Sequence, residues 1–159
     1  MKKVFIFLLS SLIAVLLLSG CNIDDTNIDN DIFQFKDSLA GDNSAVGNIA
    51  NQLSGAAYLN GFELQTNEEP YEIILNYDWM GSEEEYKETV ITNATYLFTL
   101  VQNVDLIIFN SGIRTYTIAR KNLEERYGKD LREIQNEDVL RELVQEHLED
   151  EDNLNKLLN

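Results

Sequence analysis

The chain has 159 residues, of which 28 are Asp or Glu and 12 are Lys or Arg, so its formal net charge is −16 at pH 7. A protein this acidic repels nucleic acid and anionic lipid headgroups, which excludes partners that are held mainly by a basic patch. With one cysteine, Cys21, and one histidine, His147, the chain can form no internal disulfide bond and no zinc site built from several His and Cys ligands.

Residues 1–20 contain the parts of a secretory signal peptide in their usual order. Two lysines form the basic start, and the apolar run that follows extends to Leu18, interrupted only by two serines. The run is short for a membrane span, which needs about 20 apolar residues. Small residues, Ser19 and Gly20, then precede the single cysteine.

The sequence Leu18-Ser19-Gly20-Cys21 resembles the lipobox of bacterial lipoproteins. The resemblance implies cleavage before Cys21, a diacylglycerol on the Cys21 thiol, and acylation of the new N-terminus, for example with palmitate. Two or three acyl chains anchor a protein stably, because each buried methylene contributes about 0.8 kcal/mol. We therefore expect lipid anchoring on the extracytoplasmic face of the cell membrane. An ordinary signal peptide with an unrelated cysteine, or an uncleaved anchor helix, is the alternative.

The rest of the chain supplies enough residues for one domain. Residues 21–31 are acidic and polar with scattered isoleucine, which predicts a short tether. We expect an α+β domain over residues 32–135, followed by a C-terminal helix and acidic tail over residues 136–159.

A helix is predicted at about residues 43–53, because the apolar residues there recur at the spacing of one helical face. The residues at its start, Gly41, Asp42, Asn43 and Ser44, have two interpretations. Their side chains can cap the helix, or the glycine-led turn can hold a phosphate or carboxylate on free backbone N–H groups. Capping is favoured, because the Asp42 carboxylate would repel an anion.

Two hairpins are predicted from the sequence. Period-two alternation at residues 62–66 and 71–77, on both sides of a polar link that contains Pro70, predicts the first. Short apolar runs at about residues 104–110 and 115–119, separated by a turn, predict the second.

A long helix is predicted between the hairpins. Ser82 and Glu85 match the S-x-x-E pattern of a capping box, and a helical stripe continues to about Gln102. Several β-branched threonines and valines oppose a helix here. The length decides the conflict, because a strand of about 20 residues would be atypical.

Two more helices are predicted near the C-terminus, one at about residues 119–127 with Gly128 after its end, and one beginning after Asn136. The element order is therefore α-β-β-α-β-β-α-α. This order predicts an α+β fold, in which a four-stranded, mainly antiparallel sheet of two hairpins carries its helices on one face.

Four segments together resemble one recurring domain: GDNSAVGNIANQL, FELQTNEEPYEIILNYD, TYLFTLVQNVDLIIFN and RKNLEERYGKDL. Over residues 33–135 the chain is similar to the uncharacterised 4825 family of domains of unknown function, which is found in lipoproteins of Gram-positive bacteria. Similar domains are attached to membrane metallopeptidases of the β-lactam-sensor type. The resemblance implies a bacterial, extracytoplasmic, membrane-linked domain, and it assigns no activity and no catalytic residues.

The sequence contains no recognisable catalytic set. A nucleophile needs a base beside it, whereas Cys21 is expected to carry lipid and His147 to lie on a helix, exposed or partly buried. Residues 83–85 suit a helix N-terminus, and residues 149–152 lack the ligand pattern of a calcium loop, so we expect no metal and no cofactor. We expect a binding or sensor-modulating domain whose partner is a membrane sensor or another envelope protein. An envelope-acting enzyme with dispersed carboxylates and a structural envelope lipoprotein are the alternatives.

Replacing the lipobox cysteine tests the anchoring. Cys21→Ala is expected to abolish lipid labelling, because the thiol that would carry the diacylglycerol is absent. The variant should accumulate as an uncleaved precursor or be shed into the medium. Labelling with a radioactive fatty acid, followed by immunoblots of membrane and medium fractions, measures both effects. Normal processing together with normal membrane retention of the variant would contradict the lipobox interpretation.

Overall fold

The structure of the protein, a computed structural model, describes residues 31–112, 114–148 and 158. The predicted signal peptide at residues 1–20, Cys21 and the tether up to residue 30 lie outside the described residues, as does the acidic segment 149–152. The described residues from Ile32 onward form one compact unit.

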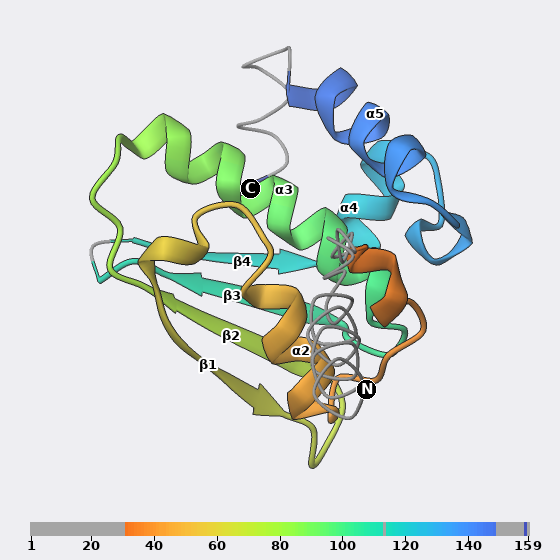
Figure 1. Ribbon diagram of the computed structural model, residues 1–159, viewed down its shortest axis with the longest axis horizontal. Helices are drawn as coiled ribbons and strands as arrows, with labels where there is room; N and C mark the ends of the chain where they lie inside the picture. The colour runs from red at the N-terminus through yellow and green to blue at the C-terminus, as the bar shows by residue number, and fades with distance from the viewer. Residues whose placement is uncertain (1–30, 113, 149–157, 159) are drawn as a thin grey trace, which may run out of the picture. The chain divides into compact units, whose positions relative to one another are not determined.

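A four-stranded sheet with the strand order β1-β2-β3-β4 organises this unit (Figure 1). Its strands are β1 (Leu59–Gln65), β2 (Glu72–Tyr77), β3 (Leu106–Asn110) and β4 (Thr115–Ala119). The pairs β1–β2 and β3–β4 are antiparallel, as the predicted hairpins require, whereas β2 and β3 are parallel. The parallel pair arises because the chain returns from the end of β2 to the start of β3 through a long helix. The mainly antiparallel sheet is confirmed.

The order of helices and strands is also confirmed. The helices are α2 (Asn43–Ala50), α3 (Glu83–Leu100), α4 (Arg120–Tyr127) and α5 (Glu137–Leu148), and short 3₁₀ turns lie at Ile32–Phe35, Ala56–Tyr58 and Leu131–Glu133. Helix α2 ends earlier than residue 53, because the chain turns after Ala50, although Leu53 is still buried in the core. Gly128 ends α4 with a φ of 63°, a left-handed conformation that suits glycine.

One face of the sheet carries the hydrophobic core. The side chains that alternate inward along three strands are buried: Ile73, Leu75, Tyr77, Ile107, Phe109 and Ile118. They belong to one cluster with buried residues of α2 and α3, such as Ile49 and Phe98. The predicted packing of helices on one face of the sheet is therefore confirmed, with α5 lying against α3.

Helix α3 accommodates its β-branched residues by internal hydrogen bonds. Its capping box is complete, since Ser82 Oγ accepts the Glu85 N–H and the Glu85 carboxylate accepts the Ser82 N–H. Thr95 and Thr99 are fully buried, and each donates its hydroxyl to the carbonyl oxygen four residues earlier, at 2.7 and 2.8 Å. These hydroxyls are therefore paired inside the core, and tertiary burial outweighs their weak helix propensity.

Arg120 joins the end of α3 to the start of α4. Its guanidinium donates to the carbonyl oxygens of Phe98, Val101 and Val104 at 2.6–2.8 Å, and its side chain is 9% exposed. The first two carbonyls lie beyond the last hydrogen bond of α3 and have no donor within the helix. Burial lowers the pKa of Arg120, and Glu124, one turn further along α4, opposes that change. The guanidinium thus satisfies the negative end of α3.

Arg120→Met is expected to lower the free energy of unfolding by about 3 kcal/mol, because it leaves three buried carbonyl oxygens without donors. Arg126→Met is the matched control, since Arg126 is exposed on the same helix and should cost less than about 0.5 kcal/mol. Urea unfolding of both variants measures the difference. Equal stability of the two variants would show that Arg120 does not hold α3 and α4 together.

Candidate functional site

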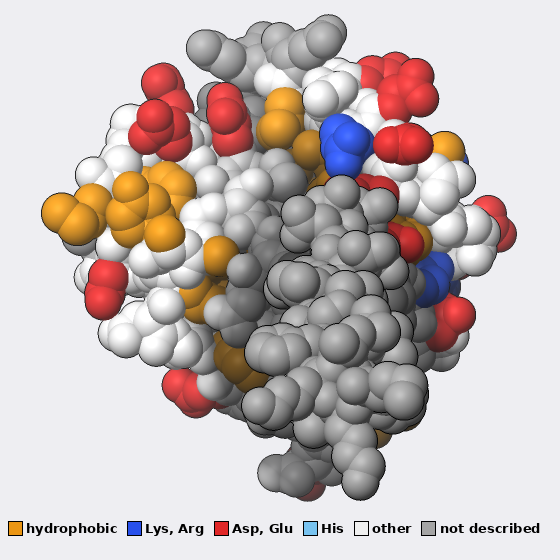
Figure 2. Space-filling model, viewed as in Figure 1, with side chains coloured by type: hydrophobic (Ala, Val, Ile, Leu, Met, Phe, Trp, Pro, Cys, Tyr) orange, Lys and Arg blue, Asp and Glu red, His pale blue; other side chains and the backbone are white. Residues whose placement is uncertain are grey.

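The second face of the sheet, which we call the outer face, is accessible to solvent. It consists of alternate residues of the four strands: Gly61, Glu63, Gln65, Glu72, Ile74, Asn76, Leu106, Ile108, Asn110, Thr115, Thr117 and Ala119. Each of them is half-buried or exposed. Acidic side chains are scattered over the view in Figure 2 with few basic ones between them, whereas the outer face carries only two charges, both on glutamates.

Four apolar residues form a patch on the outer face, which we call the outer-face patch: Ile74, Leu106, Ile108 and Ala119. The strand register places Ile74 opposite Ile108 and Leu106 opposite Ala119, so the patch is continuous across three strands. Beside it, Asn110 donates to Asn76 at 3.1 Å and accepts from Thr115 at 2.9 Å. The outer face is therefore apolar in its middle and neutral along this polar row.

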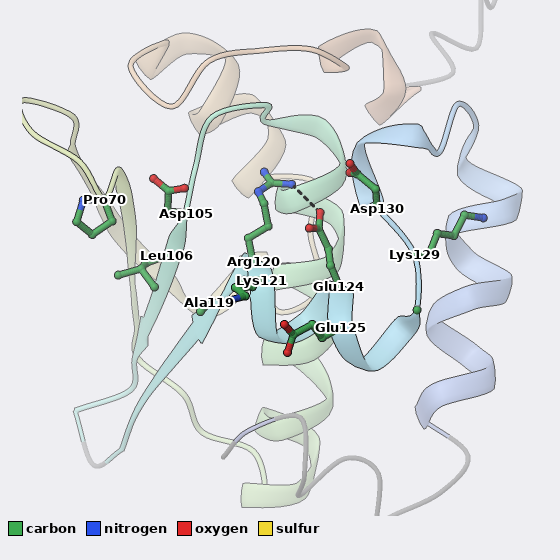
Figure 3. A pocket seen from close by; sticks show the side chains of 11 residues that line it. Pro70, Asp105, Leu106, Ala119, Arg120, Lys121, Glu124, Glu125, Lys129 and Asp130 are labelled. Atoms are coloured by element: carbon green, nitrogen blue, oxygen red, sulfur yellow. Dashed lines mark hydrogen bonds and ion pairs between the residues drawn. The ribbon is translucent and has the colours of Figure 1, made fainter.

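A groove of about 690 Å³ opens at the end of the outer face where β3 begins and β4 ends (Figure 3). Its apolar lining comes from Pro70, Leu106 and Ala119. Its charged lining comes mainly from α4 and the loop after it: Asp105, Arg120, Lys121, Glu124, Glu125, Lys129 and Asp130. Figure 3 shows Pro70, Asp105 and Leu106 on one side of Arg120 and Glu124 on the other. The groove is thus an apolar depression with mixed charges around it.

Three of the groove's carboxylates are hydrogen-bonded within the fold, and two of these, Asp105 and Glu124, tie separate segments together. Asp105 Oδ2 accepts the N–H of Tyr71 at 2.9 Å, which ties the start of β3 to the segment before β2. Glu124 Oε1 accepts the N–H of Leu131 at 3.2 Å and lies 3.4 Å from the Arg120 guanidinium. Both acids therefore already have donors.

The remaining charges of the groove fall into two groups. Asp130 forms a close pair with Arg132 at 2.8–2.9 Å, and these hydrogen bonds lower the pKa of Asp130 to about 2. Lys121, Glu125 and Lys129 are exposed, and their side chains have no hydrogen bond or ion pair within the described part of the chain. These three groups are available to a ligand.

Residues 41–44 do not line the groove. Asp42 Oδ1 accepts the N–H groups of Ser44 and Ala45 at 3.1 and 3.0 Å, so its carboxylate occupies the amides that an anion would need. Gly41 and Asp42 border a second hollow of about 550 Å³, which is also lined by Asp37. This acidic setting is typical of a helix cap and unfavourable for a phosphate or carboxylate ligand.

His147 lies on α5, half-buried. Its Nδ1 is 2.9 Å from the carbonyl oxygen of Leu143, and its ring packs edge-on against Tyr127 at 4.4 Å between centroids. Within residues 31–112 and 114–148, no group of three or more His, Cys, Asp and Glu side chains is placed to hold a metal ion. Over the same residues, no helix has the length and apolar character needed to cross a membrane.

Comparison with protein families identifies the family of this chain. Residues 32–122, more than half of its 159 residues, match the family described as a domain of unknown function, DUF4825. The chain belongs to the DUF4825 family. The resemblance expected from the sequence is thereby confirmed for the domain, and no curated protein or solved structure matches the chain. The DUF4825 match includes all four strands, the outer face and the groove as far as Lys121, whereas Glu124 to Asp130 lie beyond it.

Sequence reasoning missed the outer face and the groove of this DUF4825 domain. A signal for the outer face was present, because the runs Ile73-Ile74-Leu75 and Leu106-Ile107-Ile108-Phe109 are apolar at consecutive positions. Such runs are typical of strands that have apolar side chains on both faces. The groove had no comparable signal, since its lining comes from three separate segments of the chain.

Asp42→Ala is expected to lower the free energy of unfolding by about 1 kcal/mol, because it removes the acceptor of two helix N–H groups. Asp42→Asn is the control, since asparagine is an equally good N-cap and should cost only a few tenths of a kcal/mol. Thermal unfolding followed by circular dichroism measures both. A loss in the asparagine variant as large as in the alanine variant would contradict the capping role.

Proposed function

We propose that this DUF4825 protein is a lipid-anchored binding domain on the extracytoplasmic face of the cell membrane, whose partner is a membrane sensor or another envelope protein. The observation that carries the proposal is the outer-face patch. Surfaces that bind proteins are depleted in charge and apolar at their centre. The chain has a net charge of −16, so a partner that binds elsewhere on its surface would desolvate many charged groups. The outer-face patch is neutral and carries half-exposed isoleucines, so a partner that binds there desolvates few.

The N-terminal sequence supports the location of that partner. An acyl group at Cys21 would leave a tether of about ten residues before the compact unit that begins at Ile32. At roughly 3.3–3.6 Å per extended residue, the tether keeps the domain within a few tens of ångströms of the membrane. A partner that is itself a membrane protein lies within that distance.

The groove supports binding over hydrolysis. An enzyme that uses a pair of carboxylates needs at least one that can hold a proton for the leaving group, and hydrogen bonds donated to the ionised form oppose that protonation. Asp105, Glu124 and Asp130 each accept hydrogen bonds from the protein itself, which leaves Glu125 as the unpaired carboxylate of this groove. The arrangement therefore favours a binding function.

A charge placed in the outer-face patch tests the proposal. Ile108→Glu in the full-length protein is expected to reduce photo-crosslinking to an envelope protein in intact cells by at least about tenfold, the scale of losing one central interface residue. Gln145→Glu adds the same charge on the exposed side of α5 and is the matched control. Circular dichroism confirms that both variants fold. A crosslinked species equally abundant in both variants would exclude the outer face as the binding surface.

A further inference from the structure

We propose that the groove binds the free C-terminal carboxylate of a peptide whose last side chain lies against Leu106 and Ala119. The inference rests on the proposed binding function and names the ligand of the groove. Leu106 and Ala119 belong both to the groove and to the outer-face patch, so a bound peptide can continue from the groove over Ile108 and Ile74. The groove is thus the end of a longer binding surface.

The positive charge for a carboxylate comes from two adjacent residues. Arg120 lines the groove while its side chain is 9% exposed. A guanidinium has five N–H donors, and the contacts to Phe98, Val101, Val104 and Glu124 use four of them, which leaves one on Nη2. A buried charge acts more strongly than an exposed one, because less water screens it.

Lys121 adds a second cation at the edge of the groove. Its side chain is exposed and has no partner among the described residues, in a chain where acids outnumber bases by 28 to 12. Of the described basic residues, Arg126 and Lys129 share this property, and Lys129 also borders the groove whereas Arg126 does not. Unpaired cations are therefore concentrated at this groove.

The carboxylates of the groove decide between an anionic and a cationic ligand. Asp105, Glu124 and Asp130 already accept hydrogen bonds from the backbone or from an arginine. A cationic ligand would compete with these donors and would also approach Arg120 and Lys121. A ligand carboxylate instead pairs with the ammonium group of Lys121, which has no partner among the described residues. The lining therefore favours an anionic ligand.

The same carboxylates decide between a peptide and a lipid headgroup. The four carboxylates of the lining oppose either anion, but a phosphate group has no N–H to donate and leaves Glu125 without a hydrogen-bond donor. The C-terminal end of a peptide carries one carboxylate together with backbone N–H groups. Glu125 and the Asp105 Oδ1 atom can accept hydrogen bonds from these N–H groups. An apolar last side chain fits against Pro70, Leu106 and Ala119, and a volume of about 690 Å³ is within the range of ligand pockets.

The test compares two forms of one peptide pool. Fluorescein-labelled decapeptides with four randomised C-terminal positions are made as free acids and as carboxamides, and their retention on the full chain in detergent micelles is measured. The free-acid pool should be retained roughly tenfold better than the carboxamide pool, the effect of a charge-assisted contact. Lys121→Gln should remove most of this preference, and Lys129→Gln part of it. Arg126→Gln, an unpaired cation outside the groove, should leave the preference unchanged.

Three results would overturn the inference: equal retention of acid and carboxamide, an equal effect of Lys121→Gln and Arg126→Gln, or Lys121-dependent binding of phosphatidylglycerol vesicles without a preference for acid peptides. The last result would assign the groove to lipid. These outcomes are separable from the proposed function. If crosslinking in cells is lost in Ile108→Glu while no acid preference is measured, the binding function stands and the carboxylate ligand is wrong.

Discussion

The buried guanidinium of Arg120 determines how the end of α3 meets the start of α4. It donates to the carbonyls of Phe98 and Val101 at the C-terminal end of α3 and to the carbonyl of Val104 ahead of β3, and Arg120 is also the first residue of α4. Its own N–H donates to the carbonyl of Asp105 at 2.9 Å. Helix, loop, strand and next helix are therefore joined at one residue, and the place where α4 leaves the sheet follows from that constraint. The groove exists because α4 departs there.

Charged residues are distributed unevenly, and this distribution distinguishes the groove and the outer face from the rest of the molecule. Most of the described basic residues bond a carbonyl or a carboxylate, as Lys36 does with the carbonyls of Thr99 and Arg132. The unpaired cations Lys121, Arg126 and Lys129 all come from α4 and the loop after it. Beside them lies a sheet face with little charge and half-exposed isoleucines. If the proposed lipid anchor at Cys21 holds the domain at the membrane, such a face would let it bind a partner there.

Local signals in the sequence were sufficient for the elements of the fold. The serine and glutamate of the capping box marked the start of α3, period-two alternation marked the first hairpin, and short apolar runs on both sides of a turn marked the second. The candidate site was different, because Pro70, Asp105 and Glu124 lie far apart in the sequence and no local pattern indicates that they meet. The two interpretations of residues 41–44 differed only in where the Asp42 carboxylate points, and hydrogen bonding to Ser44 and Ala45 favours the cap.

The sequence by itself determined the acidic character, the lipobox pattern with its expectation of an anchor, and the order of helices and strands. These properties depend on composition and on neighbours within a few residues. Only the tertiary structure decided that β2 and β3 are parallel, that Arg120 bonds the C-terminal end of α3, and that the outer face ends in a groove. The hydrogen-bond partners of a buried charge are set by segments that meet through folding, and periodicity along the chain carries no information about them.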